Sequence, residues 1–144
     1  MDPAFADQLR LRGVAAERVS FAGRRSALEH LDVISRADIA LDTFPYNGHT
    51  TSLDAFWMGV PVVTMVGSTV VGRAGLSELM NLGLGELAAY DPDGFIAIAA
   101  ALASDLQRLT SVRAGLRDRM KRSPLMDAQR FAQNMEAAYR GMWR

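Results

Sequence analysis

The segment from Asn47 to Asp54 carries the side chains and spacing best suited to chemistry in this sequence. It reads Asn-Gly-His-Thr-Thr-Ser-Leu-Asp and lies between an apolar run, residues 39–41, and a helical pattern that begins at Thr50. A helix opening with Thr50 and Thr51 offers free backbone N–H groups, two hydroxyls and a positive dipole end, all of which favour phosphate. The Asp54 carboxylate suits the vicinal hydroxyls of a ribose, because it accepts through two oxygens. The pattern therefore indicates part of a nucleotide-binding site.

The same residues also fit a purely structural role. A threonine hydroxyl can form a hydrogen bond with the backbone of the first turn, and the Asp54 carboxylate can accept one in return. Such capping arrangements are common. His49 suits a donor to a phosphate or a sugar hydroxyl, or an exposed loop residue. His30, next to Glu29 on the preceding helical pattern, equally fits a surface position.

Other chemistries have weaker support. A metal site from His30, His49, Asp42 and Asp54 is conceivable, but no pair has a strong ligand spacing, so we predict no metal. Asp42 follows an apolar run, as a phosphotransfer aspartate does, without further support. No nucleophile elbow and no Walker or Rossmann glycine fingerprint is present.

Alternating strand and helix patterns surround the Asn47–Asp54 segment. We expect strands at residues 18–23, 37–41, 62–66 and 87–90, and helices at residues 5–11, 26–36, 50–58, 74–82, 91–122 and 127–142. Gly13, Gly59 and Gly83 are predicted to end helices, Ser26 and Glu29 to form a capping box, and a break is expected near residues 103–110. This alternation predicts an α/β fold with a parallel, Rossmann-like sheet and flanking helices.

Composition is that of one soluble globular domain, residues 1–144. Apolar residues make up 49% and charged residues 22%, and the formal net charge is zero, so no nucleic-acid partner is indicated. The absence of cysteine fits the cytoplasm. No apolar run approaches the roughly 20 residues of a membrane span, and no signal-peptide pattern is visible. Because a helix rather than a central strand comes first, we expect an N-terminally truncated domain.

The motifs resemble the O-GlcNAc transferase family of glycosyltransferases over nearly the whole chain. The matching segments are Leu41–Thr43, Asn47–Thr51 with Asp54, Trp57–Met65, Gly67, Arg73, Leu82–Gly83, Ser123–Leu125, and the closing Tyr139, Met142 and Trp143; upstream, Arg18–Phe21 and His30 align. The resemblance implies the incomplete C-terminal, UDP-sugar-binding lobe of a two-lobed (GT-B) enzyme. Full-length members usually carry helical TPR repeats upstream, which recruit the acceptor protein.

The resemblance also implies a role for each site residue. His30 would lie against the uridine, Thr50 and Thr51 would hold the diphosphate, Asp54 would bind the ribose, and His49 would lie near the phosphates or the sugar. The family reaction is an inverting, metal-independent transfer from a UDP-sugar, with UDP-GlcNAc as the first candidate, to a protein Ser or Thr. No cofactor is implied beyond this donor.

Two departures from the family limit the prediction. Ala27 stands where eukaryotic members have a lysine, which removes a cationic contact to the donor. The family's catalytic lysine and the acceptor lobe have no counterpart in the sequence, so we assign no catalytic residue and expect the chain alone to be inactive. The alternative is a non-catalytic nucleotide-binding or protein-interaction module. Missing strands would expose apolar surface, so we expect self-association; no membrane partner is expected.

Overall fold

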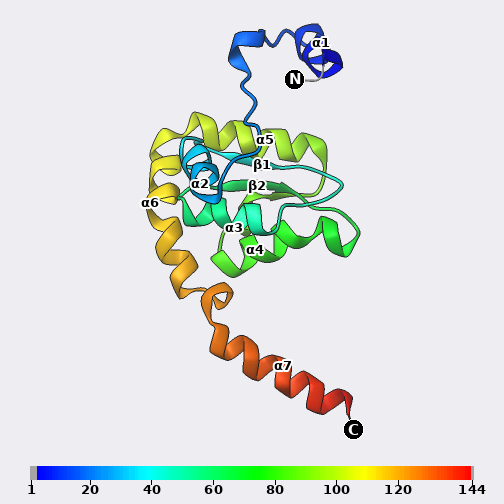
Figure 1. Ribbon diagram of the computed structural model, residues 1–144, viewed down its shortest axis with the longest axis vertical. Coiled ribbons are helices and arrows are strands. Elements are labelled where there is room, and N and C mark those ends of the chain that lie inside the picture. The colour runs from blue at the N-terminus through cyan, green and yellow to red at the C-terminus, as the bar shows by residue number, and fades with distance from the viewer. Residues whose placement is uncertain (1–2, 144) are drawn as a thin grey trace. The chain divides into compact units, whose positions relative to one another are not determined.

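The structure, a computed structural model (Figure 1), describes residues 3–143, and the side chains of all of these except residues 3, 4 and 6. The chain divides into two compact units, Met1–Val33 and Ile34–Arg144, and each is described by itself. The expectation that residues 1–144 form one truncated domain stays a prediction.

The first unit contains short helical segments: α1 (Pro3–Leu11), the 3-10 turn η1 (Ala16–Arg18) and most of α2 (Ala27–Ser35). Gly13 ends α1 as predicted, with a φ of 75° that favours glycine. The N–H groups of Gly13 and Val14 donate to carbonyls of the last turn of α1, each at 3.0 Å. This pair of bonds satisfies carbonyls that a helix end otherwise leaves open.

The strand predicted at residues 18–23 does not form. Arg18 closes η1, and the residues that follow are extended but join no sheet among the described residues. A strand exists only where its backbone groups pair with a neighbour, which β-favouring residue types cannot guarantee. Phe21 instead packs edge-on against Phe5, with ring centroids 5.9 Å apart.

The second unit is built on a parallel sheet of three strands in the order β1 (Ala40–Asp42), β2 (Val62–Met65) and β3 (Ala88–Ala89). Leu41 pairs with Val63, and Thr64 pairs with Ala88. The strand predicted at residues 37–41 begins later, at Ala40, whose N–H donates to the Pro61 carbonyl at 2.9 Å. The predicted α/β class with a parallel sheet and flanking helices is confirmed.

Helices cover both faces of this sheet (Figure 1). The second unit contains α3 (Thr50–Trp57), η2 (Val70–Gly72), α4 (Ala74–Leu82), η3 (Gly85–Leu87), α5 (Pro92–Ser104), α6 (Leu106–Arg122), η4 (Pro124–Met126) and α7 (Ala128–Met142). In Figure 1, α5 lies on one side of the sheet and α3 and α4 on the other, while α6 contacts all three helices. The break between α5 and α6 falls at Asp105, inside the predicted range.

The core lies between these layers. Its almost completely buried side chains include Phe56 on α3, Val62 and Val63 on β2, Leu79 on α4, Leu102 on α5 and Leu116 on α6. Burying one such side chain stabilises a fold by about 1.5–3 kcal/mol. Because β2 is the central strand and is covered on both faces, its residues are apolar without alternation, except for Thr64.

Glycines and acidic side chains fix the helix ends of the second unit. Gly59 and Gly83 follow α3 and α4 with φ values of 78° and 66°. The side chains of Asp91, Asp105 and Asp127 accept from backbone N–H groups in the first turns of α5, α6 and α7. Each cap of this kind contributes about 1 kcal/mol.

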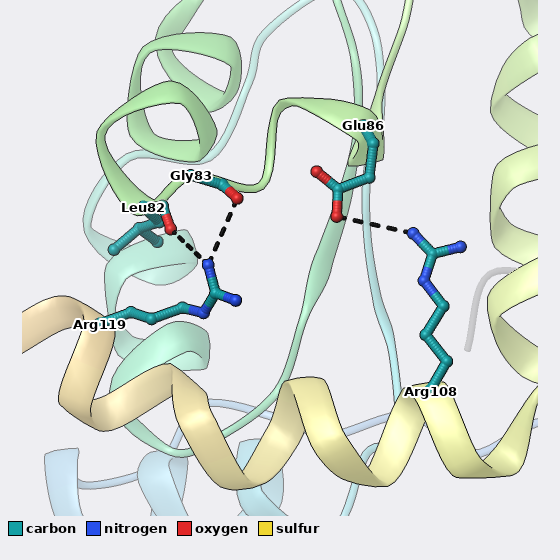
Figure 2. Close-up of polar contacts among 5 residues, drawn as sticks. All are labelled: Leu82, Gly83, Glu86, Arg108 and Arg119. Carbon is teal, nitrogen blue, oxygen red and sulfur yellow. Dashed lines mark hydrogen bonds and ion pairs between the residues drawn. The ribbon is translucent and has the colours of Figure 1, made fainter.

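Two arginines join α6 to the end of α4 and to η3 (Figure 2). The Arg119 guanidinium donates to the carbonyls of Leu82 (3.1 Å) and Gly83 (3.3 Å), at the C-terminal end of α4. Arg108 forms an ion pair with Glu86 at 3.6 Å. A guanidinium group interacts favourably with the carbonyls that have no partner at the C-terminal end of a helix. Arg119 therefore stabilises both the packing of α6 against α4 and the helix α4 itself.

Among residues 3–143, no single helix has the length and apolar composition to cross a membrane. The pair α5 and α6 passes that test only together, and it is bent by 94°. Every described residue of α7 is exposed, including the apolar side chains of Phe131, Met135, Tyr139 and Met142.

Candidate functional site

The candidate site begins at the carboxyl end of β1, where Asp42 anchors the loop that leads to α3. Asp42 is buried, and its Oδ1 accepts from the backbone N–H of Gly48 at 2.6 Å. Its Oδ2 accepts from the hydroxyl of Thr64, its neighbour on β2. Because Asp42 is buried and each of its carboxylate oxygens accepts a hydrogen bond, it fits a structural anchor and not a phosphotransfer aspartate.

Asn47 holds the same loop at a second place. Its side chain is completely buried; its amide Nδ2 donates to the Met65 carbonyl at 3.2 Å, and its backbone N–H donates to the Val71 carbonyl at 3.1 Å. The Asn47 Oδ1 is buried without a hydrogen-bond partner within the described chain. The loop is therefore fixed to the end of β2 and to η2 before α3 begins.

The N-terminus of α3 has no side-chain cap, unlike those of α5, α6 and α7; the N-terminus of α4 is also uncapped. His49 is the N-cap residue, and no side chain caps the helix. Within residues 3–143, the backbone N–H groups of Thr50 and Thr51 have no hydrogen-bond partner, whereas those of Ser52 and Leu53 donate to the His49 carbonyl. The threonine cap considered as an alternative is absent. Two N–H groups and two exposed threonines are thus available to an anion.

Gly48 allows the loop to lie close to this helix end. A Cβ on Gly48 would come within 2.6 Å of the Ser52 hydroxyl oxygen and 2.8 Å of the Thr51 hydroxyl oxygen. Such distances require neighbouring atoms to move. The glycine therefore lets the backbone approach the hydroxyls, as phosphate-binding loops do.

His49 and Asp54 complete the group on α3. His49 is exposed, and its ring centroid lies 5.9 Å from that of Tyr46, at an interplanar angle of 41°. Asp54 is half-buried and follows Thr50 and Thr51 by four and three positions, so the three residues share one helix face. The structure thus places His49, Thr50, Thr51 and Asp54 at one helix end.

His30 lies on α2 in the first unit, where its side chain is exposed. The predicted capping box at the start of that helix is confirmed: Ser26 N–H donates to Glu29 Oε2 at 3.0 Å, and the Ser26 hydroxyl donates to it at 2.8 Å. These bonds, that of the hydroxyl first, hold the pKa of Glu29 below its ordinary value. A role of His30 beside α3 stays a prediction.

A cleft of about 660 Å³, which the sequence does not predict, opens beside the α3 N-terminus. Its lining includes His49 together with Val70, Arg73, Ser77, Glu78 and Met80. α4 packs tightly against the sheet here, since a Cβ on Gly75 would lie 2.6 Å from Asp42 Oδ2. His49 therefore lies both at the cleft and at the open N-terminus of α3. The helix α4, which lines the cleft, also packs against Asp42.

Glu78 is the unexpected residue of this cleft. It is only 7% exposed, and its Oε2 is buried without a partner among the described residues. Burial, and secondarily the charge of Asp42, raise the pKa of Glu78 to about 8. Gly75, Glu78, Leu79 and Leu82 are all buried, and their helical spacing is the signal by which Glu78 could have been found.

No group of three or more His, Asp or Glu side chains that could hold a metal ion occurs in the part of the chain that the structure describes. What the site offers is open N–H groups, hydroxyls, an imidazole and a carboxylate, a set suited to a phosphorylated, hydroxyl-rich ligand.

Comparisons with known proteins agree with this chemistry. The family model described as glycosyl transferase family 41 matches residues 2–135. The chain is 46% identical over 116 residues to a petunia protein named probable UDP-N-acetylglucosamine--peptide N-acetylglucosaminyltransferase SPINDLY, covering 81% of this chain and 12% of the relative. It is 34% identical over 133 residues to the UDP-N-acetylglucosamine--peptide N-acetylglucosaminyltransferase of Caenorhabditis elegans, covering 92% and 12%.

A solved structure gives the same result. A variant of O-GlcNAc transferase from Thermobaculum terrenum is similar with a TM-score of 0.89 at 41% identity, over 99% of this chain and 28% of that chain. The chain thus spans only a part of the relatives it matches. The family match over most of its length, together with the fold, confirms the predicted resemblance, and the chain belongs to glycosyl transferase family 41.

Proposed function

We propose that this chain is the donor-binding part of a glycosyltransferase that uses a UDP-sugar. The observation that carries the proposal is the open N-terminus of α3. Two unpartnered N–H groups and the threonines that bear them follow a parallel strand, at the sheet edge where α/β folds bind ligands. Membership of glycosyl transferase family 41 supports a nucleotide sugar as the ligand.

Each site residue has a role in this proposal. Thr50 and Thr51 hold the diphosphate through backbone N–H and hydroxyl donors, and Asp54 accepts from the ribose hydroxyls. His49 donates to the phosphates or to the sugar, and His30 lies against the uridine. The positive end of the α3 dipole favours the charge that accumulates on the leaving diphosphate, so that no metal is needed.

For the whole protein we propose inverting transfer of the sugar to a Ser or Thr hydroxyl of an acceptor protein. The relatives' names make UDP-GlcNAc the first donor to test. We propose that residues 1–144 are one truncated lobe and that the chain alone does not catalyse transfer, because the reaction requires groups from a second lobe.

We further propose that the protein acts in the cytoplasm, without nucleic-acid or membrane partners. The formal net charge of zero supports the proposal that nucleic acid is not a partner.

We also propose that the chain self-associates through exposed apolar surface such as the α7 face, where Phe131 is 66% and Tyr139 is 61% exposed. A monomeric mass in light scattering well above micromolar concentration contradicts the last proposal.

Calorimetric titration of the chain with UDP tests the donor site. Thr51→Ala and Asp54→Ala should each weaken binding about tenfold, because each removes a hydrogen bond to the ligand. Thr110→Ala and Asp118→Ala, which alter exposed residues on α6, are matched controls and should leave binding unchanged.

Two outcomes contradict the proposal. One is the absence of UDP binding to the folded chain, which favours the interaction module considered above. The other is UDP binding that the α3 variants do not weaken. Transfer of sugar by the chain alone to any acceptor contradicts only the expected inactivity.

Titration in the presence of EDTA, which removes metal ions, should give the same UDP affinity, because the proposed site needs no metal.

A further inference from the structure

The turn that joins α6 to α7 (Figure 1) borders a pocket lined by cationic side chains. Its volume is about 300 Å³, and Lys121, Arg122 and Arg130 line it; we call it the basic pocket. Lys121 and Arg122 belong to the last turn of α6, and Arg130 belongs to the first turn of α7. None of the three lines the cleft beside α3 or belongs to the N-terminus of that helix. The basic pocket is therefore a feature separate from the candidate site.

Hydrogen bonds within the turn hold the backbone between these cations in place. The side chain of Ser123 is buried; its hydroxyl donates to the Met120 carbonyl at 2.8 Å and accepts from the Leu125 N–H at 3.2 Å. The N–H of Asp127 donates to the Pro124 carbonyl at 3.3 Å. Leu125 also packs against the hydrophobic core. The walls of the basic pocket are thus ordered by contacts within the protein.

The lining of the basic pocket carries two positive charges in excess, because its three cations are accompanied by a single carboxylate, Asp127. The Asp127 Oδ1 accepts from the backbone N–H of Arg130 at 2.9 Å, as the cap of α7. Within residues 3–143, the Lys121 ammonium and the Arg130 guanidinium have no hydrogen-bond or ion-pair partner. Arg122 donates only through its Nε, to the Asp118 carbonyl at 3.2 Å. Most of the donors of the three cations are therefore available to an anion.

Helix stability explains two of these cations but not the third. Lys121 and Arg122 lie at the C-terminal end of α6, where the helix dipole favours positive charge. Arg130 lies in the first turn of α7, where the dipole disfavours it, and its side chain is exposed, so no burial offsets the repulsion. A bound anion removes this conflict, because it compensates the charge of Arg130 and interacts favourably with the N-terminal end of α7.

A phosphate monoester matches the basic pocket in charge and in size. It carries about −1.5 to −2 charges at pH 7 and presents acceptor oxygens in several directions. A guanidinium pairs with two such oxygens at once, and a lysine contributes a point charge. The volume of about 300 Å³ is at the lower end of the range of small-molecule sites, which is roughly 300–1,000 Å³. A small phosphorylated molecule is thus the class of ligand that fits.

We propose that the basic pocket binds the phosphate group of a small soluble phosphomonoester. Arg122 and Arg130 donate to the phosphate oxygens from the two helices, and Lys121 adds its charge. This site shares no residue with the proposed donor site, so the inference goes beyond the proposed function and does not depend on it.

NMR titration of the ¹⁵N-labelled chain with glycerol 3-phosphate tests the proposal. Backbone N–H signals within residues 121–130 should shift and saturate, and sodium chloride at the same ionic strength should not reproduce the shifts. Arg130→Gln should raise the dissociation constant about tenfold, because it removes charge-assisted hydrogen bonds to the phosphate. Arg140→Gln, at an exposed position further along α7, is the matched control and should leave the constant unchanged.

Three results overturn the proposal: no shifts within residues 121–130, shifts that sodium chloride reproduces, and glycerol 3-phosphate binding that Arg130→Gln does not weaken. Thr51→Ala should leave the binding of glycerol 3-phosphate unchanged, and Arg130→Gln should leave the binding of UDP unchanged. Failure of this inference and failure of the proposed function can therefore be told apart.

Sedimentation with vesicles distinguishes a soluble ligand from a lipid headgroup. Phosphatidic acid is a lipid that carries a phosphomonoester, and the chain should stay in the supernatant when mixed with phosphatidylcholine vesicles that contain it. Sedimentation with these vesicles that Arg130→Gln abolishes overturns the soluble source and assigns the basic pocket to a lipid.

Discussion

Glu78→Gln should stabilise the fold by an amount that grows with pH. In the folded chain the Glu78 carboxyl is buried beside Asp42, which raises its pKa from 4.5 to about 8. Between these values the unfolded chain has lost the proton and the folded chain still binds it. Stability linked to Glu78 is therefore fully present below pH 4.5 and is lost as the pH rises toward 8. Glutamine has the same shape and does not titrate.

The size of the effect follows from the separation of the two pKa values. Each pH unit between them corresponds to about 1.4 kcal/mol, so between pH 4.5 and 7 the loss is at most about 3 kcal/mol. The free energy of unfolding of Glu78→Gln minus that of the original chain should therefore be small near pH 4 and should rise to as much as about 3 kcal/mol by pH 7.

Urea unfolding of both proteins at several pH values measures this difference. The other titrating groups are shared and their contributions cancel in the subtraction, apart from that of Asp42, whose charge interacts with Glu78. Glu136→Gln, at an exposed position on α7, is the control for replacing a surface glutamate by glutamine. A difference for Glu78→Gln that stays flat from pH 4 to 8 refutes the inference that Glu78 is protonated in the folded chain.

Other predictions concern stability, each measured by urea unfolding. Gly75→Ala should destabilise the fold by about 1–3 kcal/mol, because its Cβ has no room beside the Asp42–Thr64 pair, whereas Gly141→Ala, with open space around it, should be neutral or stabilising. Arg119→Met should lower stability by about 1 kcal/mol through loss of its bonds to the end of α4, more than Arg108→Met, which breaks one exposed ion pair. Asp105→Ala should lower it by about 1 kcal/mol by removing the cap of α6, and an unchanged midpoint contradicts that role.

Local chemistry explains why much of the fold was predictable from the sequence. Gly59 and Gly83 end their helices because a left-handed residue favours glycine wherever it occurs. The cap formed by Asp91 likewise depends only on adjacent residues. Asp54 shares a face with Thr50 and Thr51 through helical spacing alone.

Features that depend on distant residues were not predictable. Residues 18–23 have strand-forming side chains, but the neighbour that a strand needs is not encoded in the segment itself. Glu78 is a residue type that is almost never fully buried, and its environment is set by Asp42, which lies far away in the sequence. The open end of α3 is a tertiary feature too, because the sequence fits a threonine cap equally well.

The hydrogen bond from Gly48 to Asp42 has a consequence for the rate and thermodynamics of binding. The loop before α3 is held by the sheet through hydrogen bonds of Asp42 and Asn47 that lie within the protein itself. A ligand then meets a receptor whose backbone is already ordered, so association needs no disorder-to-order step and loses little conformational entropy. Weakening that anchor, as in Asp42→Asn, should make binding more enthalpic and entropically less favourable, although the Asp42 side chain is buried and bonded to Gly48 and Thr64.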